Sequence, residues 1–291
     1  MIFRASIYQF QTRGKRKMIK TKIILFGLLV LCVSSLGAFA QTSNIVKKDL
    51  SQTEIDRIVK AFTANEAQFR NALTSYVFNR SASIQTVGMG GQITGVYRRD
   101  SNLTLTNEGK RVEKILFAPM STLTEITISA ADLDNLSGVD QFAIEPAIAA
   151  QYNFNYVGKE KIDELDLYVF DVSLKVIPDL KKNKQRFFGG RIWVDDRDLM
   201  IVKTKGKAFP IPKGEQFPVV ETWRENVDGK YWFPSLASSD DELVFDNGQV
   251  VKVKMRVKYT NYSVGKTDVR IIDEEIIDEP APTPKPTPKK P

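Results

Sequence analysis

Few side chains in this sequence could do catalytic chemistry. The 291 residues include no histidine and one cysteine, Cys32. Without imidazole, the chain cannot form a histidine-based triad, use histidine as a general acid or base, or bind a metal through histidine. Cys32 lies in an apolar N-terminal run, so a mature chain that lacks this run would contain no thiol and no disulfide.

One short pattern matches nucleophilic enzymes. Ser263-Val-Gly-Lys266 has the Ser-x-x-Lys spacing of serine acylases, which place this motif at the start of a buried helix and add further motifs. Here the pattern follows an alternating strand-like run and contains glycine, so we interpret it as a coincidence. The two carboxylates of a glycoside hydrolase need only spatial proximity, and the sequence singles out no such pair. We therefore predict that the protein is not an enzyme.

A group of aspartates could attract a hard cation. Asp195, Asp196 and Asp198 offer carboxylate oxygens, which calcium prefers. A calcium loop needs further oxygen ligands at regular spacing, whereas 199–201 begins an apolar strand. Aspartate is also common in turns. The sequence thus predicts a hairpin turn here and no metal site.

A glycine-rich segment is similar to a phosphate-binding loop. Residues 87–95 contain four glycines, but a dinucleotide site needs a strand before them, a helix after them and a βαβ context. The residues that follow, 96–99 and 103–105, have a strand-like composition. We predict a bulge or bend of a β-sheet and no nucleotide or other cofactor.

Aromatic and aliphatic side chains give a stronger signal. Residues 187–194 place apolar groups on both faces of one predicted strand, and 231–233 do the same in a later hairpin. A sheet that is apolar on both faces must be covered on both, or must leave one side as a pocket. We expect a pocket for an apolar ligand, and its candidate lining residues are Phe62, Phe69, Phe142, Ile144, Phe170, Val172, Ile192, Trp193 and Met255.

A helix and a set of strands must position these side chains. Ser51 and Glu54 have the spacing of a capping box, and the following apolar residues fall mostly on one helical face. These residues are Ile55, Ile58, Val59, Phe62, Phe69 and Leu73. After Leu73 the hydrophobic period changes from 3.6 to 2, which indicates that most of the remaining chain is β-strand.

The strand pattern predicts an antiparallel meander. Apolar and other residues alternate over Tyr168–Val176 and over Val251–Tyr259. Asp228-Gly229 and Asn247-Gly248 are typical of tight hairpins. The Ala-rich residues 129–136 and 141–150 interrupt this pattern, and we predict that they form short helices or a helical loop that covers the sheet. The fold class is therefore mainly β, with an N-terminal helix and a curved antiparallel sheet covered by helices.

The net charge indicates export. The formal charge of +7 arises within the first forty residues, which hold seven bases and no acid, so residues 41–291 carry 35 of each. The basic segment precedes an apolar run, and Ala38-Phe39-Ala40 supplies the small residues of a cleavage site, which together predict a secretory signal peptide over 1–40. Met18 is an alternative start, because the basic region is unusually long. The neutral remainder gives no electrostatic reason to bind nucleic acid.

The remaining chain divides into one domain and a tail. Residues 41–272 are long enough for one large β domain. Residues 273–291 begin with an acidic patch and continue into a Pro/Lys-rich run that holds six of the thirteen prolines. Such a run cannot build a core, so we predict a disordered tail, and a spacer or contact for the cell envelope is the alternative.

Several segments resemble bacterial outer-membrane lipoprotein-sorting proteins. The similarity extends over about residues 51–262 and is densest in Tyr152–Asp163, Leu167–Phe170, Gly190–Asp196, Met200–Lys203 and Gly229–Ser235. It implies the periplasmic lipoprotein-carrier fold, an unclosed antiparallel β-barrel whose capping helices enclose an apolar cavity for acyl chains. It also implies an arginine that latches a lid, for which Arg80, Arg98 and Arg99 are all candidates.

The resemblance implies a function and a location. The expected protein is a carrier in the periplasm or envelope of a Gram-negative-type bacterium, active in outer-membrane lipoprotein sorting. Its partners would be the acyl chain of a lipoprotein or lipid, an inner-membrane donor and an outer-membrane acceptor. Lipoprotein, free lipid and glycolipid all remain open as cargo. The alternatives are an envelope interaction module without a lipid cavity and, ranked last, a carboxylate- or Ser/Lys-based hydrolase.

The signal-peptide prediction has a direct test. We expect the exported protein to begin at Gln41, after cleavage at the Ala38-Phe39-Ala40 site. Intact-mass measurement or N-terminal sequencing of the protein secreted by its own cells checks this. A mature protein that retains residues before Met18 would contradict both the cleavage site and the alternative start.

Overall fold

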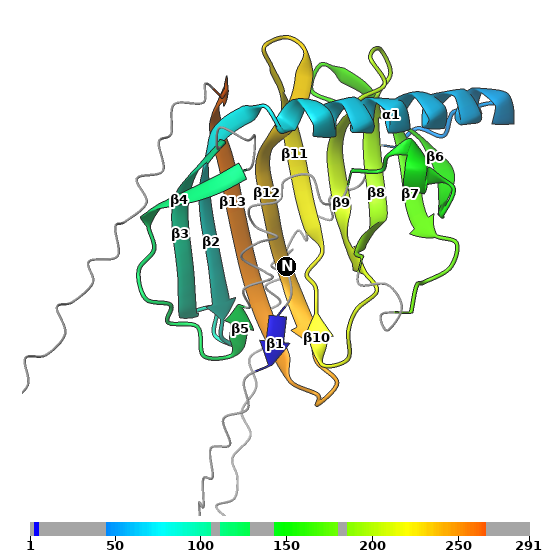
Figure 1. Ribbon diagram of the computed structural model, residues 1–291. Coiled ribbons are helices and arrows are strands. Elements are labelled where there is room, and N and C mark those ends of the chain that lie inside the picture. The colour runs from blue at the N-terminus through cyan, green and yellow to red at the C-terminus, as the bar shows by residue number, and fades with distance from the viewer. Residues whose placement is uncertain (1–2, 6–44, 106–110, 129–142, 180–184, 266–291) are drawn as a thin grey trace, which may run out of the picture.

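The computed structural model describes residues 3–5, 45–105, 111–128, 143–179 and 185–265. Within them, ten strands form one antiparallel sheet in the order β4-β3-β2-β13-β12-β11-β9-β8-β7-β6. The sheet curves around a long helix without closing into a barrel, as Figure 1 shows. This confirms the predicted fold class of a mainly β protein with an unclosed antiparallel sheet and an N-terminal helix.

The ten strands fall into three runs along the sheet. One edge holds β6, β7, β8 and β9, the middle holds β11, β12 and β13, and the N-terminal β2, β3 and β4 extend the sheet beyond β13. In sheet order the bounds are Arg111–Phe117 (β4), Ile93–Leu105 (β3), Tyr76–Val87 (β2), Val250–Val264 (β13), Tyr231–Val244 (β12), Val220–Val227 (β11), Ile201–Phe209 (β9), Phe187–Asp195 (β8), Leu165–Leu174 (β7) and Tyr152–Ile162 (β6).

A small second sheet appears at the lower end of the large one in Figure 1. It contains three short strands in the order β10-β1-β5, which are Glu215–Gln216, Phe3–Ala5 and Ile126–Ile128. Among the described residues, β5 therefore pairs with β1, which belongs to the predicted signal peptide, and makes no ladder with the ten-stranded sheet.

The hairpins form where the sequence predicts them. Asp228 and Gly229 join β11 to β12 with positive φ angles of 56° and 66°, which is the backbone that a tight hairpin turn requires. Asn247-Gly248 joins β12 to β13, and residues 196–200 join β8 to β9. In β13, buried residues alternate with exposed ones from Val251 to Tyr259, as the pattern indicates.

The end of β7 differs from the sequence prediction. The alternating pattern runs to Val176, but the strand ends at Leu174 and Val176 is 76% exposed. The neighbouring β6 begins at Tyr152, which pairs with Leu174, so no partner strand continues beyond that point. Pro178 also lacks the N–H group that a ladder needs.

The helix α1, Gln52–Leu73, lies across the strands (Figure 1). Ser51 caps it by accepting a hydrogen bond from the Glu54 amide, which confirms the capping prediction. Its 22 residues make a helix about 33 Å long, enough to cross roughly seven strands at about 4.8 Å spacing. None of the described helices is long and apolar enough to span a membrane.

The two halves of α1 bury different side chains. Ile58 and Phe62 pack into a group of residues that we call the β7/β8 cluster: Ile58, Phe62, Ile144, Tyr152, Tyr168, Phe170, Val172, Phe187, Phe188, Ile192, Val194 and Ile201. Phe69 and Leu73 pack into a second group, the β2/β13 cluster, which includes Phe78, Ala82, Ile84, Phe233, Val253, Met255, Val257 and Tyr259.

A buried ion pair lies between these clusters. Glu66 of α1 is 2% exposed and accepts two hydrogen bonds from Arg224 of β11, at 2.5 Å and 3.0 Å. The Arg224 guanidinium also lies over the Phe69 ring, 4.2 Å from its centre, and donates to the Ile201 carbonyl. These contacts fix the position of α1 along the sheet.

The Ala-rich region is described only in part. Residues 129–142, which include most of it, lie outside the described residues. The short helix α3, Pro146–Ala149, follows Ile144, which is 1% exposed and packs in the β7/β8 cluster. Arg70 of α1 and Glu145 form a 2.6 Å ion pair at the start of α3. This part of the segment therefore covers the sheet beside α1.

The Glu66–Arg224 pair generates a stability prediction. Glu66→Gln removes one charge and leaves Arg224 buried without a counterion, so we expect it to lower the free energy of unfolding by about 3–5 kcal/mol. The double variant Glu66→Met/Arg224→Met removes both charges and should recover most of that loss. Urea unfolding followed by circular dichroism measures both values.

A matched control is the exposed pair of Arg57 and Glu54 on the same helix. Arg57→Met should change the free energy of unfolding by less than about 1 kcal/mol, because exposed ion pairs contribute little. If Glu66→Gln is no more destabilising than Arg57→Met, the buried pair does not hold α1 in place.

Candidate ligand-binding site

The strand register defines an inner face of the sheet, on the side of α1. Phe170 of β7 lies opposite Ile192 of β8, and Val172 lies opposite Gly190. The Phe62 ring of α1 packs against the Phe170 ring, with 5.9 Å between ring centres. In β13, Met255 lies opposite Ile84 of β2 on this same inner face.

The structure brings seven of the predicted lining residues together on this inner face. Five of them belong to the β7/β8 cluster and two to the β2/β13 cluster, and all are between 0% and 5% exposed. The five are Phe62, Ile144, Phe170, Val172 and Ile192, and the two are Phe69 and Met255. Their role in ligand binding stays a prediction.

Trp193 lies on the outer face of the sheet, away from these seven. It packs with Leu167, Val169 and Val202 in a separate cluster, and its indole nitrogen donates a 2.7 Å hydrogen bond to Glu160. The apolar run 187–194 fills both faces of β8, so its sequence could not show on which face Trp193 falls. Phe142, the ninth candidate, lies outside the described residues.

All three tryptophans of the chain lie on this outer face. The Lys203 ammonium sits between two indole rings, 4.7 Å from the centre of Trp193 and 4.1 Å from that of Trp223. Glu221 pairs with Lys203 at 3.3 Å and accepts a hydrogen bond from the Trp223 indole. Trp232 packs beside Trp193 and donates to Asp198.

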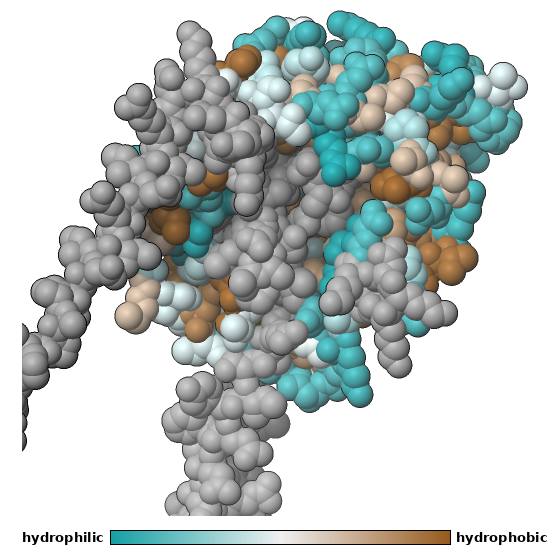
Figure 2. Space-filling view, viewed as in Figure 1, coloured by the Kyte–Doolittle hydropathy of each residue, from teal (hydrophilic) through white to brown (hydrophobic). Residues whose placement is uncertain are grey.

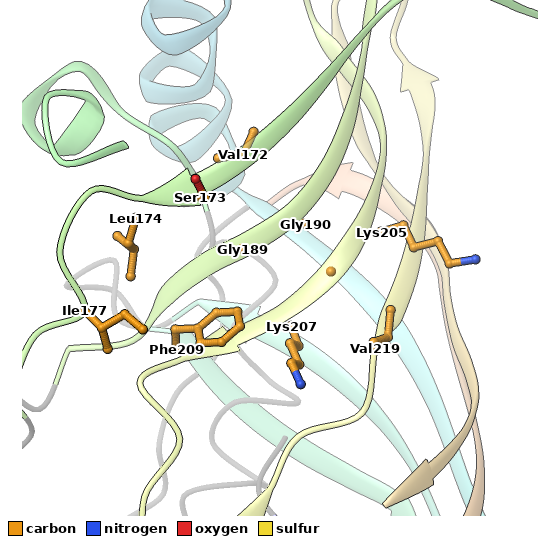
Figure 3. Close-up of a pocket in the computed structure, with 11 residues that line it drawn as sticks. Val172, Ser173, Leu174, Ile177, Gly189, Gly190, Lys205, Lys207, Phe209 and Val219 are labelled. Atoms are coloured by element: carbon orange, nitrogen blue, oxygen red, sulfur yellow. The ribbon is translucent and has the colours of Figure 1, made fainter. Parts of the chain in front are cut away.

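A cavity of about 430 Å³ lies near the ends of β7, β8 and β9, as Figure 3 shows. This volume falls in the range of small-molecule sites. Lys205, Lys207 and Phe209 alternate with Gly206 and Ala208 along β9, so they share the outer face with Lys203. The residues that line the cavity are Val172, Ser173, Leu174, Ile177, Gly189, Gly190, Lys205, Gly206, Lys207, Phe209 and Val219.

Two glycines beside this cavity are closely approached by neighbouring groups. A Cβ on Gly189 would lie 2.7 Å from the Phe209 ring, and a Cβ on Gly190 would lie 2.2 Å from the Lys205 carbonyl oxygen. The absence of side chains at Gly189 and Gly190 therefore lets the Phe209 ring and the β9 backbone lie close to β8. We call the cavity beside them the outer cavity, because Lys205, Lys207 and Phe209 line it from the outer face. Of the eight predicted lining residues that the structure describes, only Val172 also borders it.

The inner face also holds a buried polar group, which we call the Arg80 cluster: Arg80, Tyr97, Arg99, Ser101 and Glu113. Arg80 and Arg99 are two of the candidate latch arginines, but no pattern in the sequence links them to Tyr97, Ser101 or Glu113. The Arg80 side chain is 0% exposed, and its Nη2 donates hydrogen bonds to Glu113 and Ser101. Arg99 grips Glu113 with two hydrogen bonds, at 2.9 Å and 2.7 Å. Arg80 lies on the inward-facing side of β2, between Phe78 and Ala82. A charged residue among apolar residues on the buried side of a strand is the sequence signal that could have identified this group.

Burial and pairing shift the pKa values in the Arg80 cluster. Burial lowers the pKa of Arg80, although the Glu113 charge opposes this. Burial also acts to raise the pKa of Glu113, but the hydrogen bonds from Arg99 and Ser101 and the two guanidinium charges outweigh it, so the net shift is downward. Burial raises the pKa of Tyr97. Glu113 is therefore the anion that the cluster is built around.

The three candidate latch arginines differ in position. Arg80 and Arg99 belong to the buried cluster, whereas the Arg98 side chain is 53% exposed and pairs with Asp100 at 2.9 Å. Since Arg98 and Arg99 are consecutive in β3, they lie on opposite faces of the sheet. Arg98 is thus removed from the inner face.

The other motifs have structural explanations. Asp195 is buried, burial raises its pKa, and its carboxylate accepts a hydrogen bond from the Arg197 amide within the predicted turn. Among the described residues, no group of three or more histidine, cysteine, aspartate or glutamate side chains could hold a metal. The segment 87–95 forms the β2–β3 hairpin, in which Gly91 has a φ of 81° and a register shift falls at Val87. Ser263 lies in β13, and Lys266 falls outside the described residues.

Comparisons with known proteins give distant structural likenesses. No family model and no curated protein matches this sequence. A DUF1329 family protein from Desulfovibrio piger is 13% identical with a TM-score of 0.34, and the match covers 71% of this chain and 92% of that one. A LolA superfamily protein from Nitrosomonas europaea is 11% identical with a TM-score of 0.29, covering 75% and 95%. MucB, in a structure of its complex with MucA(peri), is 10% identical with a TM-score of 0.21, covering 71% and 99%. At such values, none of these likenesses determines what this chain binds.

The Arg80 cluster generates a prediction about pH. Because the pKa of Glu113 is lower in the folded state than its ordinary value of 4.5, the carboxylate stabilises the fold above that value. This stabilisation disappears as the pH falls through the lowered pKa. Glu113→Gln should therefore be less stable than the wild type at pH 7, and the difference should shrink toward pH 3.

Urea unfolding midpoints between pH 3 and pH 7 measure this difference. The exposed Glu225 offers a control, since Glu225→Gln should follow the wild-type curve at every pH. A Glu113→Gln curve parallel to that of the wild type would show that Glu113 does not stabilise the fold through its charge.

Proposed function

We propose that this protein is an exported, non-enzymatic carrier that holds acyl chains of lipoproteins or lipids against the inner face of its sheet. Its setting is the periplasm or envelope of a Gram-negative-type bacterium, where it takes part in sorting lipoproteins to the outer membrane. A membrane-bound donor and acceptor would load and unload it. The predicted leader, 1–40, and the tail, 273–291, are parts of this proposal.

The observation that carries the proposal is how the inner face is covered. The described covering elements, α1, α3 and β5, form no ladder with the ten-stranded sheet. They reach it through side chains, such as Ile58, Phe62 and Phe69 of α1 and Ile126 of β5. The helices α1 and α3 can therefore separate from the sheet without breaking a hydrogen bond between strands, although the Glu66–Arg224 pair would have to part.

The exposed inner face would suit an apolar chain. It presents phenylalanine, isoleucine, valine and methionine side chains from both clusters. Each methylene that leaves water contributes about 0.8 kcal/mol, so a long acyl chain offers enough apolar surface to replace the contacts of the cover. Part of this gain offsets the freedom that the chain loses on binding.

The second candidate is an envelope interaction module that binds protein or peptidoglycan. The close packing of the seven inner-face residues, at 0–5% exposure, favours it, because a filled interior needs no ligand. The two candidates differ in whether the purified protein holds an acyl chain.

Native mass spectrometry of the protein purified from its own envelope tests the proposal. We expect a co-purifying lipid or acylated peptide, or binding of added palmitate or lysophospholipid by the delipidated protein. If no lipid co-purifies and neither probe binds, the carrier is excluded and the interaction module is favoured.

Substitutions at two adjacent residues test where the acyl chain binds. Met255 faces inward on β13 and Arg256 faces outward. Met255→Gln places a polar amide among apolar groups, at a cost of about 1–3 kcal/mol, and should weaken palmitate binding about tenfold or more. Arg256→Gln should leave the affinity unchanged.

Tryptophan fluorescence separates the inner face from the outer cavity. Lys205 borders that cavity and lies 3.8 Å from Glu221, which accepts a hydrogen bond from the Trp223 indole. Palmitate in the outer cavity should shift the emission, whereas palmitate on the inner face should leave it unchanged. If palmitate shifts the tryptophan emission of the wild type, of Met255→Gln and of Arg256→Gln alike, the binding site lies on the outer face.

A further inference from the structure

The Arg80 cluster carries more positive than negative charge. It contains two guanidinium groups, those of Arg80 and Arg99, and one carboxylate, that of Glu113. A buried charge without a counterion is costly, and proteins normally pair it or place it in water. The Arg80 side chain is 0% exposed, so water does not solvate this charge.

The carboxylate of Glu113 is shared between Arg80 and Arg99. Its Oε1 accepts hydrogen bonds from Arg80, Arg99 and Ser101, and its Oε2 accepts one from Arg99. The bidentate grip of Arg99 is the geometry of a strong pair. Glu113 therefore compensates mainly Arg99, and the excess charge lies on Arg80.

Arg80 also has unused hydrogen-bond donors. A guanidinium has five N–H groups, and within the described ranges only those of Nη2 in Arg80 donate hydrogen bonds. Among the described residues, the Nε and Nη1 atoms of Arg80 are buried without a hydrogen-bond partner, and the Tyr97 hydroxyl donates to no acceptor. The Arg99 guanidinium lies close enough to the Tyr97 hydroxyl oxygen to interact with it. Tyr97 lies two residues from Arg99 on the same face of β3, and the Arg80 charge acts on it. The site thus offers unpaired donors and an excess positive charge.

The site adjoins the apolar inner face. On β2, Arg80 lies between Phe78 and Ala82 in the inward register, and Tyr259 of β13 lies opposite it. Toward the sheet edge, the Arg99 and Glu113 side chains keep 17% exposure. An amphiphile could place its head group here, beside the edge formed by β4, with its chain along the β2/β13 cluster.

We propose that Arg80 and Tyr97 form a subsite for the anionic oxygen of a carboxylate or phosphate group at the head of an apolar ligand. This inference rests on the proposed carrier function and narrows its cargo to anionic amphiphiles. The ligand oxygens would accept from Arg80 Nε and Nη1 and from the Tyr97 hydroxyl, and their charge would balance the cluster.

Matched probes test this subsite. Isothermal titration of the delipidated protein compares palmitate with hexadecanol, which has the same chain length but no charge. Hydrogen bonds to a charged group contribute about 1.5–3 kcal/mol, so palmitate should bind about ten- to hundredfold more tightly. Lysophosphatidic acid, titrated beside its uncharged monoacylglycerol, distinguishes a phosphate head group from a carboxylate.

Substitutions of Arg80 test whether this residue causes the preference for palmitate over hexadecanol. Arg80→Met removes the charge and the unpaired donors, so palmitate should bind no more tightly than hexadecanol, whose affinity should stay as in the wild type. Arg98→Met removes the exposed neighbour and should leave the preference for palmitate intact. If Arg80→Met fails to fold, Arg80→Lys keeps the charge without the guanidinium fork, and its preference should fall several-fold.

The outcomes separate this inference from the carrier proposal. Wild-type protein that binds palmitate and hexadecanol equally overturns the anion subsite and leaves the carrier standing. An undiminished preference for palmitate in the Arg80 variants also overturns it. A protein that binds none of the four probes overturns the carrier proposal itself.

Discussion

The position of α1 depends on one buried ion pair. Glu66 and Arg224 are 2% and 8% exposed, and they lie where the two inner-face clusters meet. A buried ion pair is weak support for stability, because desolvation offsets most of its attraction. It does select one arrangement, since any sliding of the helix would separate the charges. Phe62 is therefore held over the β7/β8 cluster and Phe69 over the β2/β13 cluster, so the inner face keeps two distinct halves.

The second buried arginine of the inner face contrasts with the first. Arg224 has a carboxylate, a carbonyl and an aromatic ring as partners. Arg80 shares its carboxylate with Arg99, and two of its nitrogen atoms have no hydrogen-bond partner in the described part of the chain. The same low-polarity interior thus holds one balanced and one unbalanced arginine. The Arg224–Glu66 pair positions the helix, whereas the uncompensated charge of Arg80 is a reason to seek a ligand.

Local patterns predicted most of the fold. The cap at Ser51, the helical face from Ile58 to Leu73 and the hairpin at Asp228-Gly229 depend on neighbours in sequence, and the structure confirms them. The failures depend on distant partners. The end of β7 is set by where β6 begins, and the position of Trp193 is set by a strand whose two faces are equally apolar. The Arg80 cluster joins residues from β2, β3 and β4, and no local spacing relates Arg80 to Glu113.

The charge of the chain and the architecture of the sheet lead to the same kind of binding. Beyond the predicted leader, acids and bases are equal in number, so long-range electrostatics favours no polyanionic partner. The remaining candidate surface is the apolar inner face, whose described cover forms no strand pairing with the ten-stranded sheet. Such a face selects poorly among apolar chains, because each methylene contributes about the same free energy wherever it lies. Selectivity must therefore come from a fixed polar group at one end of that face, and the Arg80 cluster is a buried polar group in that position.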